Sequence, residues 1–169
     1  MATFLERGRR IPLDFTPGTV LVLKPTSGTT RIAKPAFFDL DLYNEKSDIL
    51  LHIRFCRTRI TFNCYARRSL GNGFGKAQFV DMNSVNLKGQ LVDMVTVSIH
   101  HYLTDSEFGR YQILFDGTTI FHFDKCLPGP ATQIGYDTPY PAGPSCWDVE
   151  VYQIDELLPG DRAALFPGR

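Results

Sequence analysis

Two neighbouring segments of the chain, residues 49–56 and 59–65, alternate apolar and polar side chains with a period of two. Because successive side chains of a β-strand point to opposite faces, this period predicts two strands, each with one apolar and one polar face. The apolar face holds Leu51, Ile53, Phe55, Ile60 and Phe62, and the polar face holds His52, Arg54, Cys56, Thr61 and Asn63. Such a pair of strands covers a core on one side and presents polar groups on the other.

A regular strand face of His, Arg, Thr and Asn does not suit a core, because burying a polar group is costly unless it is hydrogen-bonded. It suits a surface that hydrogen-bonds a polar ligand, so His52, Arg54 and Asn63 are candidate binding residues. Two alternatives remain open. His52 could be a partly buried histidine bonded to a neighbour, and the arginines between residues 54 and 68 could form a charged edge that discourages strand pairing.

The rest of the chain also has the pattern of an all-β protein. Short runs rich in Val, Ile, Phe, Tyr and Thr recur between clusters of Gly, Pro, Asn and Asp. We expect strands near residues 19–24, 37–43, 49–56, 59–65, 76–80, 94–100, 111–115, 118–124 and 149–154. The Asp116-Gly117 pair predicts a tight hairpin turn, because it accepts the positive φ that such a turn requires. Antiparallel strands in this number predict a sandwich of two sheets.

The length of 169 residues suits one domain with its own core, and we expect a single domain over residues 1–169. Residues 128–145 are rich in Pro and Gly, and we expect them to form a long loop. The short tail from residue 158 also contains Pro and Gly, so at most one helical turn is expected there.

Composition and charge argue against several classes of partner. Lys and Arg together number 18, as do Asp and Glu, so no strong attraction to nucleic acid or to an anionic membrane is expected. No segment is long and apolar enough to insert into a membrane, and the N-terminus lacks the apolar stretch of a secretory signal. We expect a cytoplasmic protein, or an extracellular one that is exported without a signal peptide.

The cysteines and histidines lack the spacing of a metal site or a redox motif. The four cysteines show no C-x-x-C pattern, so we expect reduced thiols, with a disulfide between Cys56 and Cys64 as the alternative. His100 and His101 are adjacent in a strand and face opposite ways, so they cannot easily share a metal. No P-loop, dinucleotide fingerprint, nucleophile elbow or carboxylate pair is present. We expect no metal, no cofactor and no enzymatic activity.

Several segments follow one another in a characteristic order. They are Phe15-Thr16-Pro17-Gly18, Phe37-Phe38-Asp39-Leu40, Leu50-Leu51-His52-Ile53-Arg54-Phe55, Ile60-Thr61-Phe62-Asn63, Gly73-Phe74-Gly75, Tyr111-Gln112-Ile113-Leu114-Phe115-Asp116-Gly117 and Asp148-Val149-Glu150-Val151. In this order they resemble the carbohydrate-recognition domain of the galectin family over about residues 13–154. The sequence motifs are most similar to those of fungal galectins. The resemblance implies an all-β jelly-roll sandwich of two antiparallel sheets, with sugar bound on the concave face of one sheet.

In that family the sugar contacts come from the motifs H-x-N-x-R, V-x-N and W-G-x-E-x-R, and this chain matches them in part. His52 matches the first histidine, and Asn63 matches the asparagine of the second strand. Phe74 stands at the stacking tryptophan, and Ala77 or Gln78 falls near the glutamate. The resemblance implies that His52 and Asn63 hydrogen-bond hydroxyl groups and that Phe74 stacks on the sugar.

The chain departs from the family at the charged positions. Arg54 stands where asparagine is usual, and Cys56 stands where arginine is usual, although the adjacent Arg57 could serve if the strand bulges. Phe79 or Val80 falls near the second arginine. Loss of two charge-assisted hydrogen bonds would cost about 3 kcal/mol, which is roughly 100-fold in affinity. We therefore expect a specificity altered from simple β-galactosides.

The first hypothesis is a lectin that binds glycans or glycoconjugates non-covalently. Its binding residues would be His52, Arg54, Arg57, Asn63, Phe74 and Gln78, with the arginines contacting a ring oxygen or an anionic group. The alternative is a galectin-fold protein-interaction module that has lost sugar binding and acts through a sheet face or edge. A homo-oligomer would fit a lectin, because multivalency raises avidity.

Overall fold

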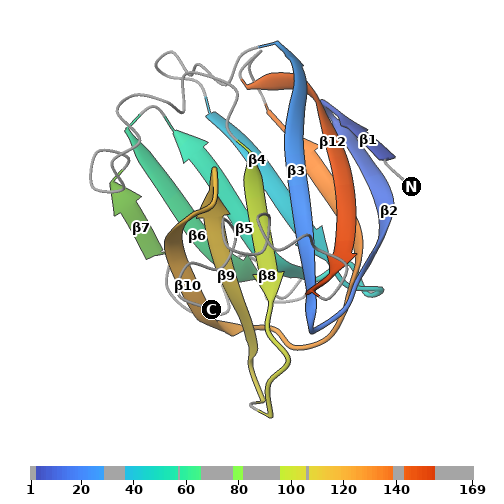
Figure 1. The fold of residues 1–169 in the computed structure, drawn as a ribbon, viewed down its shortest axis with the longest axis vertical. Coiled ribbons are helices and arrows are strands. Elements are labelled where there is room, and N and C mark those ends of the chain that lie inside the picture. The colour runs from blue at the N-terminus through green and yellow to red at the C-terminus, as the bar shows by residue number, and fades with distance from the viewer. Residues whose placement is uncertain are drawn as a thin grey trace.

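The computed structural model describes residues 3–28, 37–56, 58–65, 78–81, 96–105, 107–138 and 143–154. These residues form two antiparallel sheets of six strands each, which pack face to face (Figure 1). The β3 sheet has the order β1 (Thr3–Glu6), β12 (Pro144–Gln153), β3 (Thr19–Gly28), β8 (Val97–His101), β9 (Gly109–Phe115) and β10 (Thr118–Cys126). The β5 sheet has the order β2 (Arg9–Phe15), β11 (Ala131–Asp137), β4 (Phe37–Tyr43), β5 (Ile49–Cys56), β6 (Arg59–Tyr65) and β7 (Gln78–Asp81).

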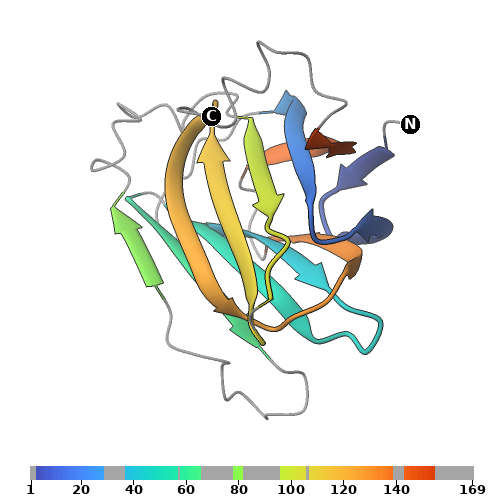
Figure 2. The same cartoon turned by 60° about the horizontal axis from the view of Figure 1, so that its bottom comes forward.

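The chain crosses between the sheets near both of its ends. β1 lies in the β3 sheet, β2 in the β5 sheet and β3 in the β3 sheet again, and β11 and β12 also lie in different sheets. Strands β4 to β7 instead follow one another within the β5 sheet, and strands β8 to β10 follow one another within the β3 sheet. Figure 2 shows the two layers from another side, with β8 to β10 in one and β4 to β6 in the other. The predicted two-sheet antiparallel jelly-roll sandwich is confirmed.

Alternate side chains of each strand build the core between the sheets. In β5, Leu51, Ile53 and Phe55 are fully buried or nearly so. The Phe55 ring stacks on Phe115 of β9, with ring centroids 5.5 Å apart. Burial of a side chain of this size contributes about 1.5–3 kcal/mol. The face predicted to be apolar is therefore the core face of the β5 sheet.

The hairpin between β9 and β10 turns at Asp116-Gly117, as predicted. The φ angles of these residues are 47° and 79°, and positive values at both central positions define the turn type that matches the twist of the strands. Asp116 Oδ1 accepts the Thr96 N–H at 2.8 Å, and the Asp116 N–H donates to the Thr96 oxygen at 2.9 Å. These contacts anchor the turn to the residue that precedes β8.

The prediction of a long loop over residues 128–145 is wrong for residues 131–137, which form β11, and for residues 144–145, which begin β12. β11 pairs with β2 on one side and with β4 on the other, so it is an interior strand of the β5 sheet. Its residues Ile134 and Tyr136 are buried. The Pro and Gly residues on both sides of this short strand concealed its alternation. The tail from residue 158 lies outside the described residues, and the single domain stays a prediction.

The strands β1 and β2 are also absent from the sequence prediction. Both lie at sheet edges, where charged residues and proline are tolerated. Arg9, Arg10 and Pro12 give β2 the composition of a loop, although it pairs along its length with β11.

All four cysteines carry free thiols, so Cys56 and Cys64 form no disulfide with each other. Cys64 of β6 is instead hydrogen-bonded to Cys126 of β10, which joins the two sheets through the core. Burial raises the pKa of the Cys126 thiol above its usual range. Because both side chains are fully buried, the pair belongs to the packing of the core.

Candidate functional site

The register of β4, β5 and β6 aligns the polar side chains of the predicted face in two rows. The first row is Asp41, His52 and Asn63, and the second row is Asp39, Arg54 and Thr61. The residues that alternate with them along each strand are buried in the core, so all six belong to the outer face of the β5 sheet. Neighbours within a row are about 5 Å apart across the strands. The structure thus brings His52, Arg54 and Asn63 together.

His52 lies between two carboxylates. Its Nδ1 is 2.5 Å from Asp41 Oδ1, and its Nε2 is 3.9 Å from Asp39 Oδ1. A carboxylate only accepts hydrogen bonds, so Nδ1 carries the hydrogen and donates it to Asp41. His52 is 9% exposed and each aspartate is 6% exposed, so water screens these contacts weakly. Asp41 therefore sets the orientation of the imidazole ring.

Arg54 is held from two sides. Its Nε and Nη2 donate to Asp39 Oδ1 and Oδ2 at 2.8 Å and 2.9 Å, which is the bidentate geometry of a strong ion pair. Its guanidinium carbon also lies 3.9 Å from the centre of the Phe37 ring, within cation–π range. The side chain is 39% exposed. Its guanidinium is thus oriented in advance while part of it faces solvent.

Asn63 occupies the same row as His52 and is 6% exposed. Its Oδ1 accepts the N–H of Cys64 at 2.8 Å. This bond to the backbone fixes the side-chain amide, so Asn63 is also a pre-oriented polar group.

The remaining predicted site residues do not join this group within the described structure. Gln78 pairs with Phe62, whose ring is buried in the core, so strand alternation assigns Gln78 to the face opposite His52. Gln78 is exposed because β7 is the last strand of its sheet. Arg57 and Phe74 lie outside the described residues.

Asp39 and Asp41 were not identified as site residues from the sequence, although they hold the two central side chains of the site. A signal was present, because these two acids alternate with Phe38, Leu40 and Leu42 in an otherwise apolar strand. Charged residues are rarely buried unless they are paired. Two acids at a period of two therefore indicate partners of opposite charge on a neighbouring strand.

Tyr43 and Arg10 border the site on the side of β2 and β11. The Arg10 guanidinium lies 3.6 Å from the centre of the Tyr43 ring, and it donates to Gln133 Oε1 at 3.4 Å. The Tyr43 ring lies against Gly135, where an added Cβ would be 3.1 Å from Tyr43 Cε2. Burial, and next the nearby Asp41, raise the pKa of Tyr43. The site is thus bounded on this side by a packed aromatic ring.

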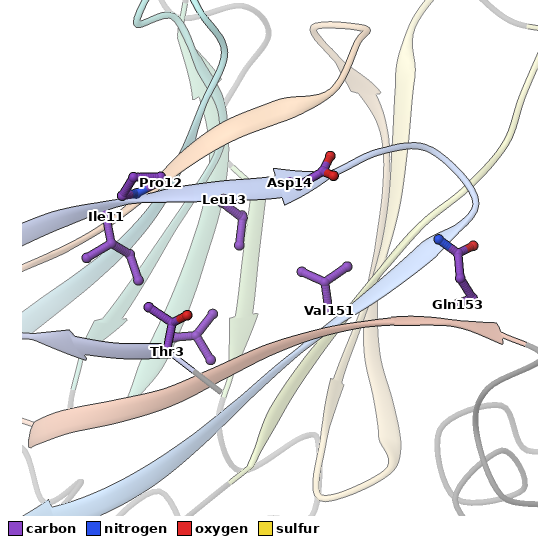
Figure 3. A pocket seen from close by; sticks show the side chains of 8 residues that line it. Thr3, Ile11, Pro12, Leu13, Asp14, Val151 and Gln153 are labelled. Atoms are coloured by element: carbon purple, nitrogen blue, oxygen red, sulfur yellow. The ribbon is translucent and has the colours of Figure 1, made fainter. Parts of the chain in front are cut away.

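A groove of about 390 Å³ lies away from the site, between β1, β2 and β12 (Figure 3). Ile11, Leu13 and Val151 are among its apolar lining residues, and Asp14 and Gln153 are among its polar ones. Across the described ranges, no cluster of three or more His, Cys, Asp or Glu could hold a metal ion. The same residues include no helix with the length and hydropathy needed to cross a bilayer.

No protein-family model and no curated protein sequence matches this chain. Solved structures do match it. Sheep galectin-11 in complex with glycerol superposes with a TM-score of 0.58, over 88% of this chain and 99% of the sheep chain. The chain has the galectin fold. Its sequence identity to sheep galectin-11 is 13%.

Two further galectins extend this likeness. Xenopus laevis galectin-Ib has a TM-score of 0.58 at 15% identity, over 90% of this chain and all of the other. Toad ovary galectin, solved with thio-digalactose, has a TM-score of 0.57 at 17% identity, over 89% and 98% of the two chains. At such identities the comparison shows the fold, and the similarity to fungal galectins stays a prediction.

Proposed function

We propose that this galectin-fold chain is a lectin that binds glycans non-covalently on the outer face of β4, β5 and β6. His52, Arg54 and Asn63 contact the sugar, while Asp41 and Asp39 hold the first two side chains in place. The observation that supports this most directly is the presence of two paired contacts, His52 with Asp41 and Arg54 with Asp39, side by side on an outer sheet face.

This arrangement suits sugar hydroxyls, which both donate and accept hydrogen bonds. The carboxylates supply acceptors, the arginine supplies donors, and the imidazole adds its second ring nitrogen, within two adjacent rows of the sheet. Each of these side chains already has its orientation before a ligand arrives. Binding therefore loses less conformational entropy than it would with mobile side chains.

We further propose that the specificity is altered from simple β-galactosides. In the family motif, the charged pair is the glutamate and arginine of the last segment, whereas here the charged pair is Asp39 and Arg54 on β4 and β5. The pair is therefore displaced across the sheet towards β4. A sugar hydroxyl that accepts a hydrogen bond from Arg54 must fit beside Asp39. The site is therefore expected to recognise a hydroxyl at another position of the sugar than the family motif does.

A glycan array with lactose, other β-galactosides and chitooligosaccharides tests this function. We expect wild type to bind at least one glycan class, and we expect His52→Ala and Asn63→Ala to lose binding by about tenfold or more, because each removes a hydrogen bond to the ligand. His122→Ala is the matched control, since His122 is an exposed histidine on β10 of the other sheet. Full binding by both site variants would show that the site is elsewhere.

One observation favours the protein-interaction module as the second candidate. The Nε and Nη2 donors of Arg54 are both engaged by Asp39. A blank array from folded wild-type protein would favour that module over the lectin. The homo-oligomer and the cellular location stay predictions. Light scattering after size-exclusion chromatography measures the oligomeric state.

A further inference from the structure

The outer face of the β3 sheet carries a second apolar cluster, which is separate from the core. Val20 and Val22 of β3 alternate with leucines of the core, so strand alternation places both valines on the outer face, which lies towards the viewer in Figure 1. Leu114 of β9 belongs to the same cluster. The outer face of a sheet is normally open to solvent, but Val20 and Leu114 are 0% exposed and Val22 is 7% exposed. A further layer therefore covers this cluster.

The residue between these apolar side chains is covered as tightly. Val22 pairs with Ser98 of β8, and Ser98 pairs with Leu114. Ser98 is 0% exposed, and its Oγ has no hydrogen-bond partner among the described residues. Burying a hydroxyl in this way costs free energy, which the burial of apolar surface must offset. The layer over Ser98 is therefore apolar where it meets this row.

The neighbouring row shows where the cover ends. Val20 pairs with His100, His100 with Gln112, and Gln112 with His122 of β10. Along this row the exposed fraction rises from 0% at Val20 to 3% and then 7%, and His122 is exposed. On the opposite side of the sheet, Phe4 of β1 is 58% exposed. The cover thus lies over β3, β8 and β9, and it leaves Phe4 and His122 open to solvent.

The chain reaches this covered area at the end of β12. Tyr152 pairs with Val20, and both Tyr152 and Ile154 pack against the apolar cluster. Ile154 is the last described residue, and residues 155–169 follow it. Leu114 lies three strands away from β12, which is about 14 Å at the spacing of a sheet. The 155–169 segment can span up to about 50 Å when extended, so it is long enough to cross the whole area.

The composition of the 155–169 segment suits an apolar cover. Its large apolar side chains form two pairs, Leu157 with Leu158 and Leu165 with Phe166. Pro159-Gly160 follows the first pair, and this dipeptide favours a turn. Burial of these side chains against Val20, Val22 and Leu114 would remove apolar surface of both partners from water.

We propose that the 155–169 segment folds back over the outer face of the β3 sheet and covers Val20, Val22, Ser98 and Leu114. This intramolecular contact closes the outer face of the β3 sheet to other molecules. It is independent of the proposed glycan site, which lies on the other sheet. A protein partner would have to bind elsewhere or displace the 155–169 segment.

Modification of the histidines by diethyl pyrocarbonate, followed by mass spectrometry, tests this contact. His100 lies beneath the cover, whereas the next residue, His101, is buried in the core and His122 is exposed. In the wild-type protein we expect His122 to react and His100 to be protected. The three residues thus report separately on the open surface, the cover and the core.

The test variant keeps the full-length chain and combines the substitutions Leu157→Ser, Leu158→Ser, Leu165→Ser and Phe166→Ser. In this variant His100 should react about tenfold faster or more, because loss of apolar burial raises the population of the uncovered state. His101 and His122 should keep their wild-type rates. Phe4→Ser is the matched control, since it removes an exposed phenyl ring outside the covered area, and it should leave all three rates unchanged. A wild-type rate for His100 in the combined variant would overturn the proposal in favour of a cover by another segment.

Photochemical cross-linking decides the question if rapid reaction of His101 shows that the combined variant has lost its core. The variant Phe166→benzoylphenylalanine carries the photoreactive group in an otherwise wild-type chain. We expect cross-links from position 166 to peptides of β3, β8 and β9 in the same molecule, and none to these peptides when the group replaces Phe4. Cross-links from position 166 to the β5 sheet alone, or between two copies of the chain, would overturn the intramolecular cover.

Discussion

Asp39 and Asp41 set the orientation of Arg54 and His52, because a buried or half-buried charge requires a fixed partner. Each aspartate lies directly opposite its partner in the register of β4 and β5. Loss of one partner would leave the other as an unsatisfied group, at a cost of about 1–3 kcal/mol. The pairs that build the candidate site therefore also contribute to the stability of the sheet.

His101 gives a prediction about the pH dependence of stability. It is buried against the rings of Tyr111 and Phe15, and this burial lowers its pKa to about 4. In the unfolded chain a histidine titrates near 6.5. Between about 6.5 and 4 the unfolded state binds a proton that the folded state does not, so the free energy of unfolding should fall by about 3 kcal/mol as the pH drops through this window.

Urea denaturation at a series of pH values measures this effect. His101→Phe removes the titrating group and should show a smaller decrease of stability over the same window. The carboxylates are the same in both proteins, so the difference between the two profiles reports on residue 101. Parallel pH profiles for wild type and variant would contradict the assignment of the decrease to His101.

Among the elements, β11 of the β5 sheet and β12 of the β3 sheet contact each other near the start of β12. β11 fills the space between β2 and β4, and its Tyr136 donates a hydrogen bond to the Pro144 oxygen of β12 at 2.6 Å. Gly143, directly before β12, lies against the same tyrosine and against Phe38. The Gly143 backbone therefore leaves no room for a side chain between these two rings.

Gly143→Ala should therefore destabilise more than Gly129→Ala. Both glycines have positive φ, 73° and 105°, which costs an alanine about 1–2 kcal/mol. Only at Gly143 would the new Cβ lie 2.6 Å from Phe38 Cδ1 and from Tyr136 Oη, whereas no atom lies within 4 Å at Gly129. We expect this crowding to add about 1–3 kcal/mol, measured by urea denaturation. Equal losses in the two variants would show that the rings move aside freely.

At the scale of the whole molecule, both sheets share one core. Phe38 of the β5 sheet lies 4.5 Å from Phe55 and 6.1 Å from Trp147 of β12, measured between ring centroids. Trp147 is 1% exposed and is the single tryptophan of the chain. Its fluorescence therefore reports on the packing of one sheet against the other.

Phe115→Ala should lower the free energy of unfolding by about 3–5 kcal/mol, because it leaves a cavity beneath Phe55. Phe4→Ala, at an exposed position, should stay within about 0.5 kcal/mol of wild type. In each protein, Trp147 fluorescence and far-ultraviolet circular dichroism should change in one coincident transition. Two separate transitions would contradict the single domain predicted from the sequence.

The central strands β4, β5 and β6 and the edge strands β7 and β10 were predictable from the sequence, whereas β1, β2 and β11 were not. β4, β5 and β6 begin and end at the predicted residues, because a strand that buries one face must alternate in sequence. β2 and β11 were not predicted because both strands are short, and the Arg, Pro and Gly residues in or beside them are typical of loops. Of the candidate site, His52, Arg54 and Asn63 could be grouped by alternation, whereas the placement of Gln78 required the register of β7.

The alternation of apolar and polar residues was enough to predict the all-β class, the core face and the polar face of β5 and β6. Alternation is a local property, and it needs no knowledge of which strands become neighbours. The register of the folded sheet is what places Asp41 opposite His52, Asp39 opposite Arg54, and Phe79 at the end of the row of Asp39 and Arg54. Register is set by how all strands pack around one core, and a shift of one residue would move every one of these side chains to the other face.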